Sequence, residues 1–337
     1  MNYVSVGDMA QSFQLRQHNT QLKTTLSQLS QEVASGIKQD IGAAVAGDFS
    51  SLSGINRSLS MMDSYNVVTT EAALTTDTMQ ETLGVISSLS EDSATTLLSA
   101  ATNSSPTLID VTAANAAVKF DTLISALNTN VAGRYVFSGA ATDTAPLADP
   151  ADILSALKTE ISGATSAEDA ITLIDSWFSA PAGGGGFIDT AYRGDDSLGL
   201  SFRIADGETT SIDSSASDPR IRDVIKGFAI ASLMADGLFG GDQGARSTLS
   251  VAAGERILSG NSSLTGLAAE IGSKQGKIAD AQTRNQAEST SLKLARTELI
   301  SADPYESATA LEAVSTQLET LYTLTSRLSR LSLADYI

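Results

Sequence analysis

The chain has 337 residues and a formal net charge of -18, because 39 Asp and Glu outnumber 21 Lys and Arg. A surface this acidic repels phosphate backbones and anionic membranes, so we expect no nucleic-acid or membrane partner. No cysteine is present, which excludes disulfides, zinc ribbons and thiol catalysis.

The first stretch, MNYVSVGDMAQSFQLRQ, has no basic start followed by an apolar run. We therefore predict no cleavable secretory signal peptide. No uninterrupted apolar stretch approaches the ~20 residues that span a bilayer. If the protein is exported, it is expected to leave the cell by another route.

Apolar residues at heptad spacing predict an amphipathic helix in the first segment, residues 1–40. They are Leu15, Leu22, Leu26, Leu29 and Val33. Their steps of seven, four, three and four place them on one stripe of a helix. The pair Ser35-Gly36 is predicted to end this helix, which we interpret as an N-terminal assembly helix.

Residues 41–135 are predicted to form the N-terminal arm of a helical rod, since no proline occurs before Pro106. The stretch GRYVFSG, residues 133–139, ends this arm with bulky β-favouring side chains in a chain that is only 5% aromatic. We interpret Gly133 as the C-cap of the preceding helix. The following residues are expected to be extended, with Tyr135 and Phe137 on one face.

Residues 136–245 have the composition of a variable α+β domain, with a glycine cluster at 183–186 and most of the prolines. The stretch LGLSFRIADGETTSI predicts two strands joined by a turn at Asp206-Gly207. The stretches ADILSALKTEI and EDAITLIDSWF predict short helices. We expect a separate domain with its own core, which could be removed while the rod still folds.

Residues 246–302 are predicted to form the C-terminal arm of the rod. Its heptad positions are Leu264, Leu267, Ile271, Lys274, Ile278, Ala281, Asn285, Glu288, Leu292, Ala295 and Leu299. Because eight of these eleven are apolar, the arm can pack along the N-terminal one. The predicted fold class is therefore mainly α: a long antiparallel helical rod from N- and C-terminal arms, with an inserted α+β domain in the middle.

Residues 303–337 are predicted to form a C-terminal assembly helix. Asp303 is a good N-cap, Pro304 suits the first helical position, and Glu306 stands three residues after the cap. Apolar residues then recur at steps of three and four up to Leu331. Two thin helices that hold only each other bury little surface, so we expect many copies to pack their apolar faces side by side.

The predicted assembly interface combines residues of both terminal helices. It comprises Leu15, Leu22, Leu26, Leu29, Val33, Leu318, Leu321, Leu328, Leu331 and Tyr336.

The residues offer little for catalysis. The one histidine, His18, lies within the N-terminal heptad pattern, which favours a polar helix position over a catalytic base. The glycine cluster lacks the Lys-Ser/Thr of a phosphate-binding loop. Five loop acids, Asp195, Asp196, Asp206, Asp213 and Asp218, fit no EF-hand spacing. We predict no enzyme activity, no cofactor and no metal site.

Three stretches carry a resemblance to a known family: GRYVFSG at 133–139, FRIADGETT at 202–210, and the tail from Asp303 to Ile337. With them, the chain resembles the flagellin family of bacterial axial proteins, and its Leu-Ser-Leu…Tyr-Ile ending is similar to that of the hook-associated proteins at the hook–filament junction. The resemblance covers most of the chain, and the tail is its most specific part.

The resemblance implies a structural protein of the bacterial flagellum, extracellular and exported without a cleavable signal. The implied partners are further copies of the chain in a layered assembly, a neighbouring hook-associated protein, flagellin, the flagellar export apparatus and an export chaperone. Two other interpretations stay open: a minor flagellin of the filament itself, and a secreted coiled-coil effector.

Overall fold

The computed structural model describes residues 6–103, 105–195, 197 and 199–334, without the side chains of 6–8 and 328–334. The chain divides into two compact units. One combines residues 1–63 with 286–337, and the other is residues 64–285. This division is coarser than the five predicted segments, whose boundaries remain predictions.

The fold is mainly α, as predicted, and the strands among the described residues form two small antiparallel hairpins. The helices of the 64–285 unit include α4 (Pro106–Leu127), α5 (Pro150–Glu160), α6 (Ala167–Ser179), α7 (Phe187–Thr190) and α8 (Pro219–Ala235), with the 3-10 turn η1 (Ile161–Gly163) after α5. Two longer helices, α3 (Ser50–Thr102) and α9 (Gln243–Ile300), belong to both units.

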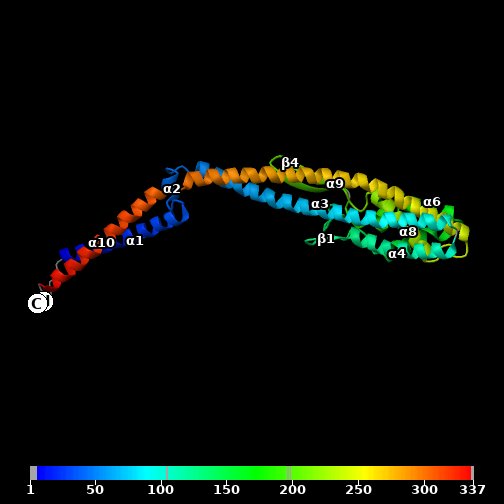
Figure 1. The fold of residues 1–337 in the computed structure, drawn as a ribbon, viewed down its shortest axis with the longest axis horizontal. Helices are drawn as coiled ribbons and strands as arrows, with labels where there is room; N and C mark the ends of the chain where they lie inside the picture. The colour runs from blue at the N-terminus through cyan, green and yellow to red at the C-terminus, as the bar shows by residue number, and fades with distance from the viewer. Residues whose placement is uncertain (1–5, 104, 196, 198, 335–337) are drawn as a thin grey trace. The chain divides into compact units, whose positions relative to one another are not determined.

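Within the 64–285 unit, α3 and α9 lie side by side and run antiparallel (Figure 1). The Ser250 hydroxyl donates to the Leu97 carbonyl at 2.9 Å, and the Gln275 amide donates to the Asp77 carboxylate at 2.7 Å. Positions later in α9 therefore meet positions earlier in α3. The antiparallel pairing of the two arms is confirmed in this unit.

The predicted heptad stripe of α9 faces the core as far as Asn285. Leu264, Leu267, Ile271, Ile278 and Ala281 are buried. The stripe then shifts by one position, so that Ser289 is buried and Glu288 is exposed. Asn285 itself is buried and donates to the Ile204 carbonyl of a β-hairpin at 2.8 Å. A polar residue in the stripe thus ties α9 to the inserted region.

The inserted region contains the elements that the sequence predicted. The two short helices are α5 and α6, and the predicted hairpin is β3 (Leu200–Ala205) paired with β4 (Glu208–Ile212). At the turn between them Gly207 has a φ of +68°, a conformation that glycine adopts without strain.

The expectation that this region has its own core is wrong. Helix α8 lies within it and packs along α4 (Figure 1). Its residues Ile221, Val224, Phe228 and Leu233 join one continuous core with α3, α4 and α9. Eleven of the residues of α8 are buried, so the helix needs neighbours on several sides. Removing residues 140–245 would strip this helix from α4.

The role predicted for Gly133 is also wrong. Helix α4 ends at Leu127, and Gly133 lies instead in the turn of a hairpin formed by β1 (Asn130–Val131) and β2 (Arg134–Tyr135). Ala132 and Gly133 have φ values of +52° and +84°, as a type I′ turn requires. After the hairpin the expected alternation fails, because Val136 and Phe137 are both buried while Tyr135 is half-buried.

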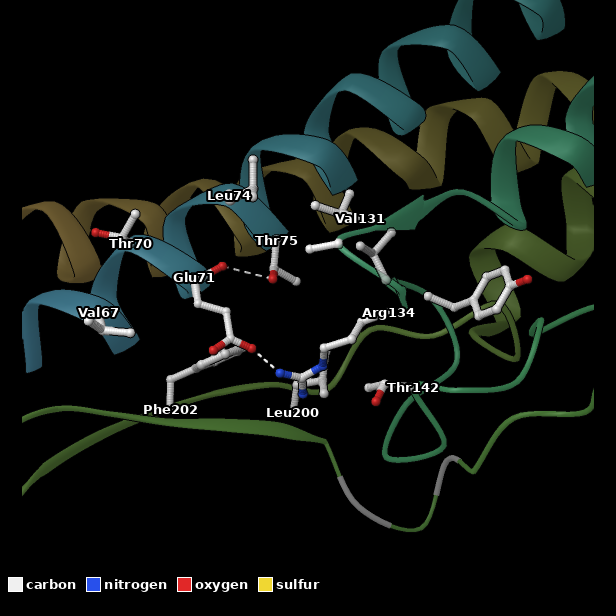
Figure 2. Close-up of a pocket in the computed structure, with 13 residues that line it drawn as sticks. Val67, Thr70, Glu71, Leu74, Thr75, Val131, Arg134, Thr142, Leu200 and Phe202 are labelled. Atoms are coloured by element: carbon white, nitrogen blue, oxygen red, sulfur yellow. Dashed lines mark hydrogen bonds and ion pairs between the residues drawn. The ribbon is translucent and has the colours of Figure 1, made fainter. Parts of the chain in front are cut away.

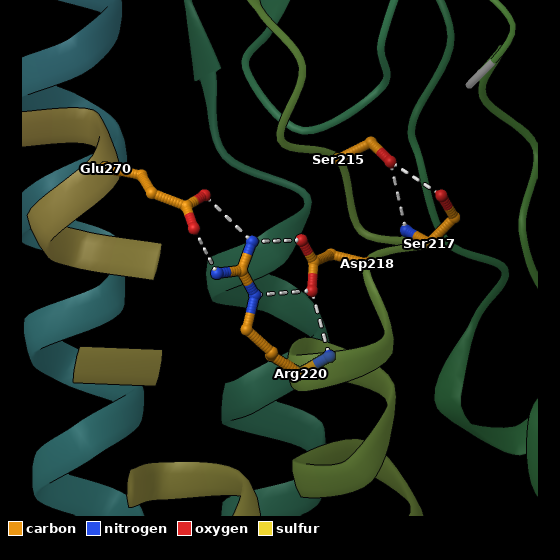
Figure 3. Close-up of polar contacts among 5 residues, drawn as sticks. All are labelled: Ser215, Ser217, Asp218, Arg220 and Glu270. Carbon is orange, nitrogen blue, oxygen red and sulfur yellow. Dashed lines mark hydrogen bonds and ion pairs between the residues drawn. The ribbon is translucent and has the colours of Figure 1, made fainter. Parts of the chain in front are cut away.

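The N-terminus of α8 is held by a cap and an ion-pair cluster (Figure 3). An Asp218 oxygen accepts a hydrogen bond from the Arg220 backbone N–H at 2.9 Å. The Arg220 guanidinium then joins Asp218, at 2.8 Å, to Glu270 of α9, at 2.9 Å. The hydrogen bond from Arg220 holds the pKa of Glu270 below its usual range. The cluster fixes the start of α8 against α9.

Helices α8 and α9 approach closely where α8 carries a glycine. A Cβ atom on Gly227 would lie 2.5 Å from Ile257 Cγ1 and 2.9 Å from the Ala253 carbonyl oxygen. Both neighbours belong to α9, and Ile257 is fully buried. A larger residue at 227 would therefore force the two helices apart.

We predict that Gly227→Ala lowers the free energy of unfolding by about 1–3 kcal/mol, the usual cost of overpacking. Gly276→Ala is the matched control, because nothing lies within 4 Å of a Cβ at that position of α9. The control should raise stability by ~0.5–1 kcal/mol, since alanine loses less backbone entropy in a helix. Urea denaturation measures both, and equal effects would contradict the close approach.

A charged cluster joins α6, α8 and α9. Asp175 accepts hydrogen bonds from Arg256 Nε and Lys226 Nζ, both at 3.1 Å. Burial raises the pKa of Asp175, but the hydrogen bonds from Arg256 and Lys226 outweigh it and hold this pKa below its ordinary value. The ionised carboxylate therefore stabilises the folded state.

We predict that ionised Asp175 contributes its full stabilisation at pH values above the ordinary aspartate pKa. This stabilisation is lost as the pH falls through the lowered pKa that Asp175 has in the folded chain. Urea denaturation from pH 7 to 2 should show a smaller acid-induced loss of stability for Asp175→Asn than for the unchanged chain. The control, Asp206→Asn, removes an exposed pair with Arg203 and should leave the curve almost unchanged. Identical curves for all three chains would contradict the role of Asp175.

Candidate functional site

The candidate site lies in the unit formed by residues 1–63 and 286–337, where helices α1 (Val6–Ser35) and α10 (Pro304–Ala334) pack against each other (Figure 1). Both predicted helix boundaries are confirmed. Gly36 follows α1 with a φ of +70°, and its N–H donates to the Glu32 carbonyl at 2.8 Å. Asp303 caps α10 by accepting from the backbone N–H of Tyr305 at 2.8 Å.

The described residues of the predicted interface lie mainly along the covered faces of this pair. Leu318 is buried, with 7% of its surface exposed. The half-buried members are Leu15, Leu22, Leu26, Leu29 and Leu321. Val33 departs from the pattern and is 44% exposed near the end of α1. The heptads thus predict which faces of α1 and α10 are covered within one chain.

Three predicted residues cannot be placed in the same way. Leu328 and Leu331 lie in α10, but their side chains are outside the described part of the structure. Tyr336 lies outside the described residues altogether. Their assignment to an interface between copies remains a proposal, as it does for the other members.

The terminal helices also expose large apolar side chains away from the covered faces. Phe13 is 63% exposed and Met9 is 58% exposed on α1, and Tyr322 and Leu324 are about half exposed on α10. The interface predicted from the sequence includes none of these four residues. The signal was present in α1, where Met9 and Phe13 are four residues apart and therefore share a face.

The segment that follows α1 pairs with the end of α9 and the residues that lead into α10. Ile37 and Ser301 form an antiparallel bridge. The Lys38 N–H donates to the Ile300 carbonyl, and the Ala302 N–H donates to the Gly36 carbonyl, both at 2.9 Å. We call residues 36–38 and 300–302, joined by these two bonds, the backbone clasp.

A side chain of α1 supports the clasp. Glu32 Oε1 accepts a hydrogen bond from the Gln39 N–H at 2.8 Å, across the turn that follows the helix. On the other strand Ile300 and Ala302 are 5% and 6% exposed. The clasp is therefore partly shielded from water, which strengthens its hydrogen bonds.

Charge is distributed unevenly between the two units. Residues 64–285 contain 27 Asp and Glu against 13 Lys and Arg, a net charge of -14. The unit with the terminal helices contains 12 acidic and 8 basic residues, a net charge of -4. The apolar helix pair thus lies in the part of the chain where copies repel one another least.

A groove lies in the other unit, between α3 and the two hairpins (Figure 2). Its volume is about 470 Å³, and its walls are mainly apolar, with Val67, Leu74 and Phe202 among them. Glu71 and Arg134, the charged groups among its described lining residues, form an ion pair with each other. The two charged groups of the groove therefore neutralise each other.

Of the loop acids considered as metal ligands, two form ion pairs with arginines and one lies outside the described residues. Asp206 forms an ion pair with Arg203, and Asp218 holds Arg220. Asp196 is outside the described residues. Among the residues that the structure describes, no three His, Cys, Asp or Glu side chains gather closely enough to hold a metal ion.

Comparison with known proteins identifies the C-terminal part of the chain. Residues 257–337 match the family model of the bacterial flagellin C-terminal helical region. The segment runs from within α9 to the end of the chain and contains all of α10. The resemblance to the flagellin family predicted from the sequence is confirmed over this segment.

The chain is also similar to two solved structures. One is FlgL of Bacillus cereus, with 15% identity and a TM-score of 0.49, where the match covers 73% of this chain and 100% of the other. The second is described as a flagellar hook-associated protein of Vibrio parahaemolyticus, with 15% identity, a TM-score of 0.46, and coverage of 73% and 95%. No curated protein matches the chain in sequence.

None of the helices in the described part of the chain combines the length and apolar character needed to cross a membrane.

We predict that α1 and α10 are less protected from hydrogen exchange than the buried helices of the 64–285 unit in dilute monomer. A two-helix pair buries little apolar surface, so local opening there costs less free energy. On assembly the protection of both helices should rise. Equal protection of α1, α10 and α8 in the monomer would contradict this prediction.

Proposed function

We propose that the chain is a structural component of the bacterial flagellum that joins the hook to the filament and polymerises through its terminal helices. The observation that carries the proposal is the flagellin C-terminal helical region at 257–337, whose last helix packs on α1. The helices at the two chain ends, held together as one unit, form a surface suited to repeated lateral packing.

Packing of α1 against α10 does not cover all of the large apolar side chains of these two helices. Phe13 and Met9 of α1, with Tyr322 and Leu324 of α10, remain exposed in the single chain. Large apolar side chains that stay exposed on a pair of thin helices are candidates for burial against a neighbouring copy. Burying each side chain against a neighbouring copy stabilises the assembly by roughly 1.5–3 kcal/mol.

The proposal extends to partners and location. The protein is extracellular in the flagellum, is exported without a cleavable signal, and is delivered by the flagellar export apparatus with an export chaperone. In its layer it contacts further copies, a neighbouring hook-associated protein and flagellin. Its role is structural rather than enzymatic, which agrees with a groove whose charged groups neutralise each other.

Deleting the gene and imaging the cells tests the function directly. Hooks without filaments, together with flagellin shed into the medium, are the expected result. Normal filaments on the deletion strain would contradict a junction role. Filaments that are only shorter or fewer would identify a minor flagellin instead.

We predict that Leu321→Asp with Leu328→Asp yields a protein that is made and exported but does not anchor filaments. Leu321 is half-buried against α1, and a carboxylate at this position would lose part of its hydration when copies pack together. The melting of the 64–285 unit should be almost unchanged, because its core is built from other residues. Electron microscopy and swimming assays measure the outcome.

The matched control places the same two charges on exposed leucines of the other unit. Leu108 and Leu258 are 38% and 51% exposed. Leu108→Asp with Leu258→Asp should leave filament attachment intact. Normal filaments and swimming in the Leu321 and Leu328 variant would show that the terminal seam does not hold the layer together.

A further inference from the structure

A leucine seam specifies which faces of two helices meet, but not how far one helix is shifted along the other. In α1 the covered leucines recur at steps of seven, four and three, so a slip of one heptad would place leucine near leucine again. The 31 residues of α10 carry a similar repeat. Coiled coils resolve this ambiguity with a specific polar or geometric feature.

We propose that the backbone clasp sets the register of α1 against α10, and that Glu32 is a positioning residue for it. The clasp joins residues that are 264 positions apart in sequence, through the Ile37–Ser301 bridge. It lies just after α1 ends at Ser35 and just before α10 begins at Pro304. The two helices are therefore anchored at one common point.

The hydrogen-bond pattern defines the geometry of this anchor. The two bonds flank the bridge, so Ile37 and Ser301 form a non-hydrogen-bonded antiparallel pair. In such pairs the Cα atoms lie ~4.5 Å apart and the side chains are close. A slip of either segment breaks both bonds together and leaves shielded backbone groups unpaired.

Glu32 extends the anchor into α1. Its carboxylate accepts from the Gln39 N–H and its carbonyl accepts from the Gly36 N–H, so one residue of the last helical turn holds both ends of the following turn. A second contact agrees with the same register, since Lys23 Nζ lies 5.9 Å from the centre of the Tyr322 ring. The clasp thus decides which residues of α1 lie beside which residues of α10.

The inference rests on the proposed function for its purpose, although the clasp itself can be tested in the monomer. The chain has no cysteine, so introduced cysteines report only on the chosen pair. Ile37→Cys with Ser301→Cys should form a disulfide within one chain on mild oxidation, because their spacing suits one. Each single variant should give only links between chains. Failure of the double variant to link within one chain overturns the clasp.

Register is measured with a second pair of cysteines and a short thiol cross-linker. Lys23→Cys should link to Tyr322→Cys, and much less to Ser315→Cys or Ser329→Cys, which lie one heptad away on either side. Adding Lys38→Pro removes the N–H that donates to Ile300 and should raise the heptad-shifted products about tenfold, as expected for lost hydrogen bonds. Lys38→Ala keeps this N–H and should give the original pattern. An unchanged pattern with Lys38→Pro overturns the role of the clasp.

Glu32 is tested with two substitutions that differ in one property. Glu32→Gln keeps an oxygen that can accept from Gln39, whereas Glu32→Ala removes it. The shifted cross-links should increase with alanine and not with glutamine. Equal patterns for the two variants overturn the positioning role of Glu32. Circular dichroism melting of each variant checks that the 64–285 unit remains folded.

Assembly separates this inference from the proposed function. Sedimentation should show that the oxidised Ile37–Ser301 double variant assembles as well as the unchanged chain, and that Lys38→Pro assembles several-fold less. Full assembly by Lys38→Pro would overturn the need for a fixed register. If the clasp cross-link forms but no chain assembles, the proposed function fails and the assembly role of the clasp fails with it.

Discussion

The packing of α9 against α3 and α8 is the contact on which the 64–285 unit depends. It requires small residues where the helices come closest. A Cβ on Gly254 would lie 2.7 Å from the Leu98 side chain, and one on Gly260 would lie 2.7 Å from Val224. These glycines lower helix propensity by about 1 kcal/mol each, a cost that close packing offsets. One helix can therefore contact both the first long helix and the inserted helix α8.

This shared core explains which parts of the fold the sequence could predict. The ends of α1 and α10 could be predicted because helix ends depend on local residues. Examples are the glycine after Ser35 and the Asp303-Pro304 step. The same Asp-Pro step at 218–219 begins α8, yet that helix was missed. Glycine and proline in the surrounding sequence indicated a separate α+β domain, and local composition does not reveal that α8 packs on α4.

The GRYVFSG segment shows a second limit of local patterns. Gly133 has a positive φ, as a helix C-cap would, so the conformational preference was correct. Its structural role is different, because the chain has already left α4 at Leu127 and forms a hairpin with Ala132 at the turn. Alanine is uncommon at a position with φ above zero, and its presence there hid the hairpin signal.

Two features define the candidate site: the apolar stripes of α1 and α10, and the backbone pairing beside them. Only the first can be predicted from a residue pattern. The heptad spacing marks the faces of α1 and α10 that cover each other, and Leu318 and Leu22 lie on them. The pairing of residues 36–38 with 300–302 involves backbone atoms, which any sequence supplies, so no residue pattern announces it. In the proposed assembly, the repeating apolar seam sets which faces of α1 and α10 meet, and the backbone clasp sets their register.

The net charge of the unit with residues 1–63 and 286–337 is low, which favours close packing of copies through this unit. The strongly acidic 64–285 unit disfavours close contact between copies.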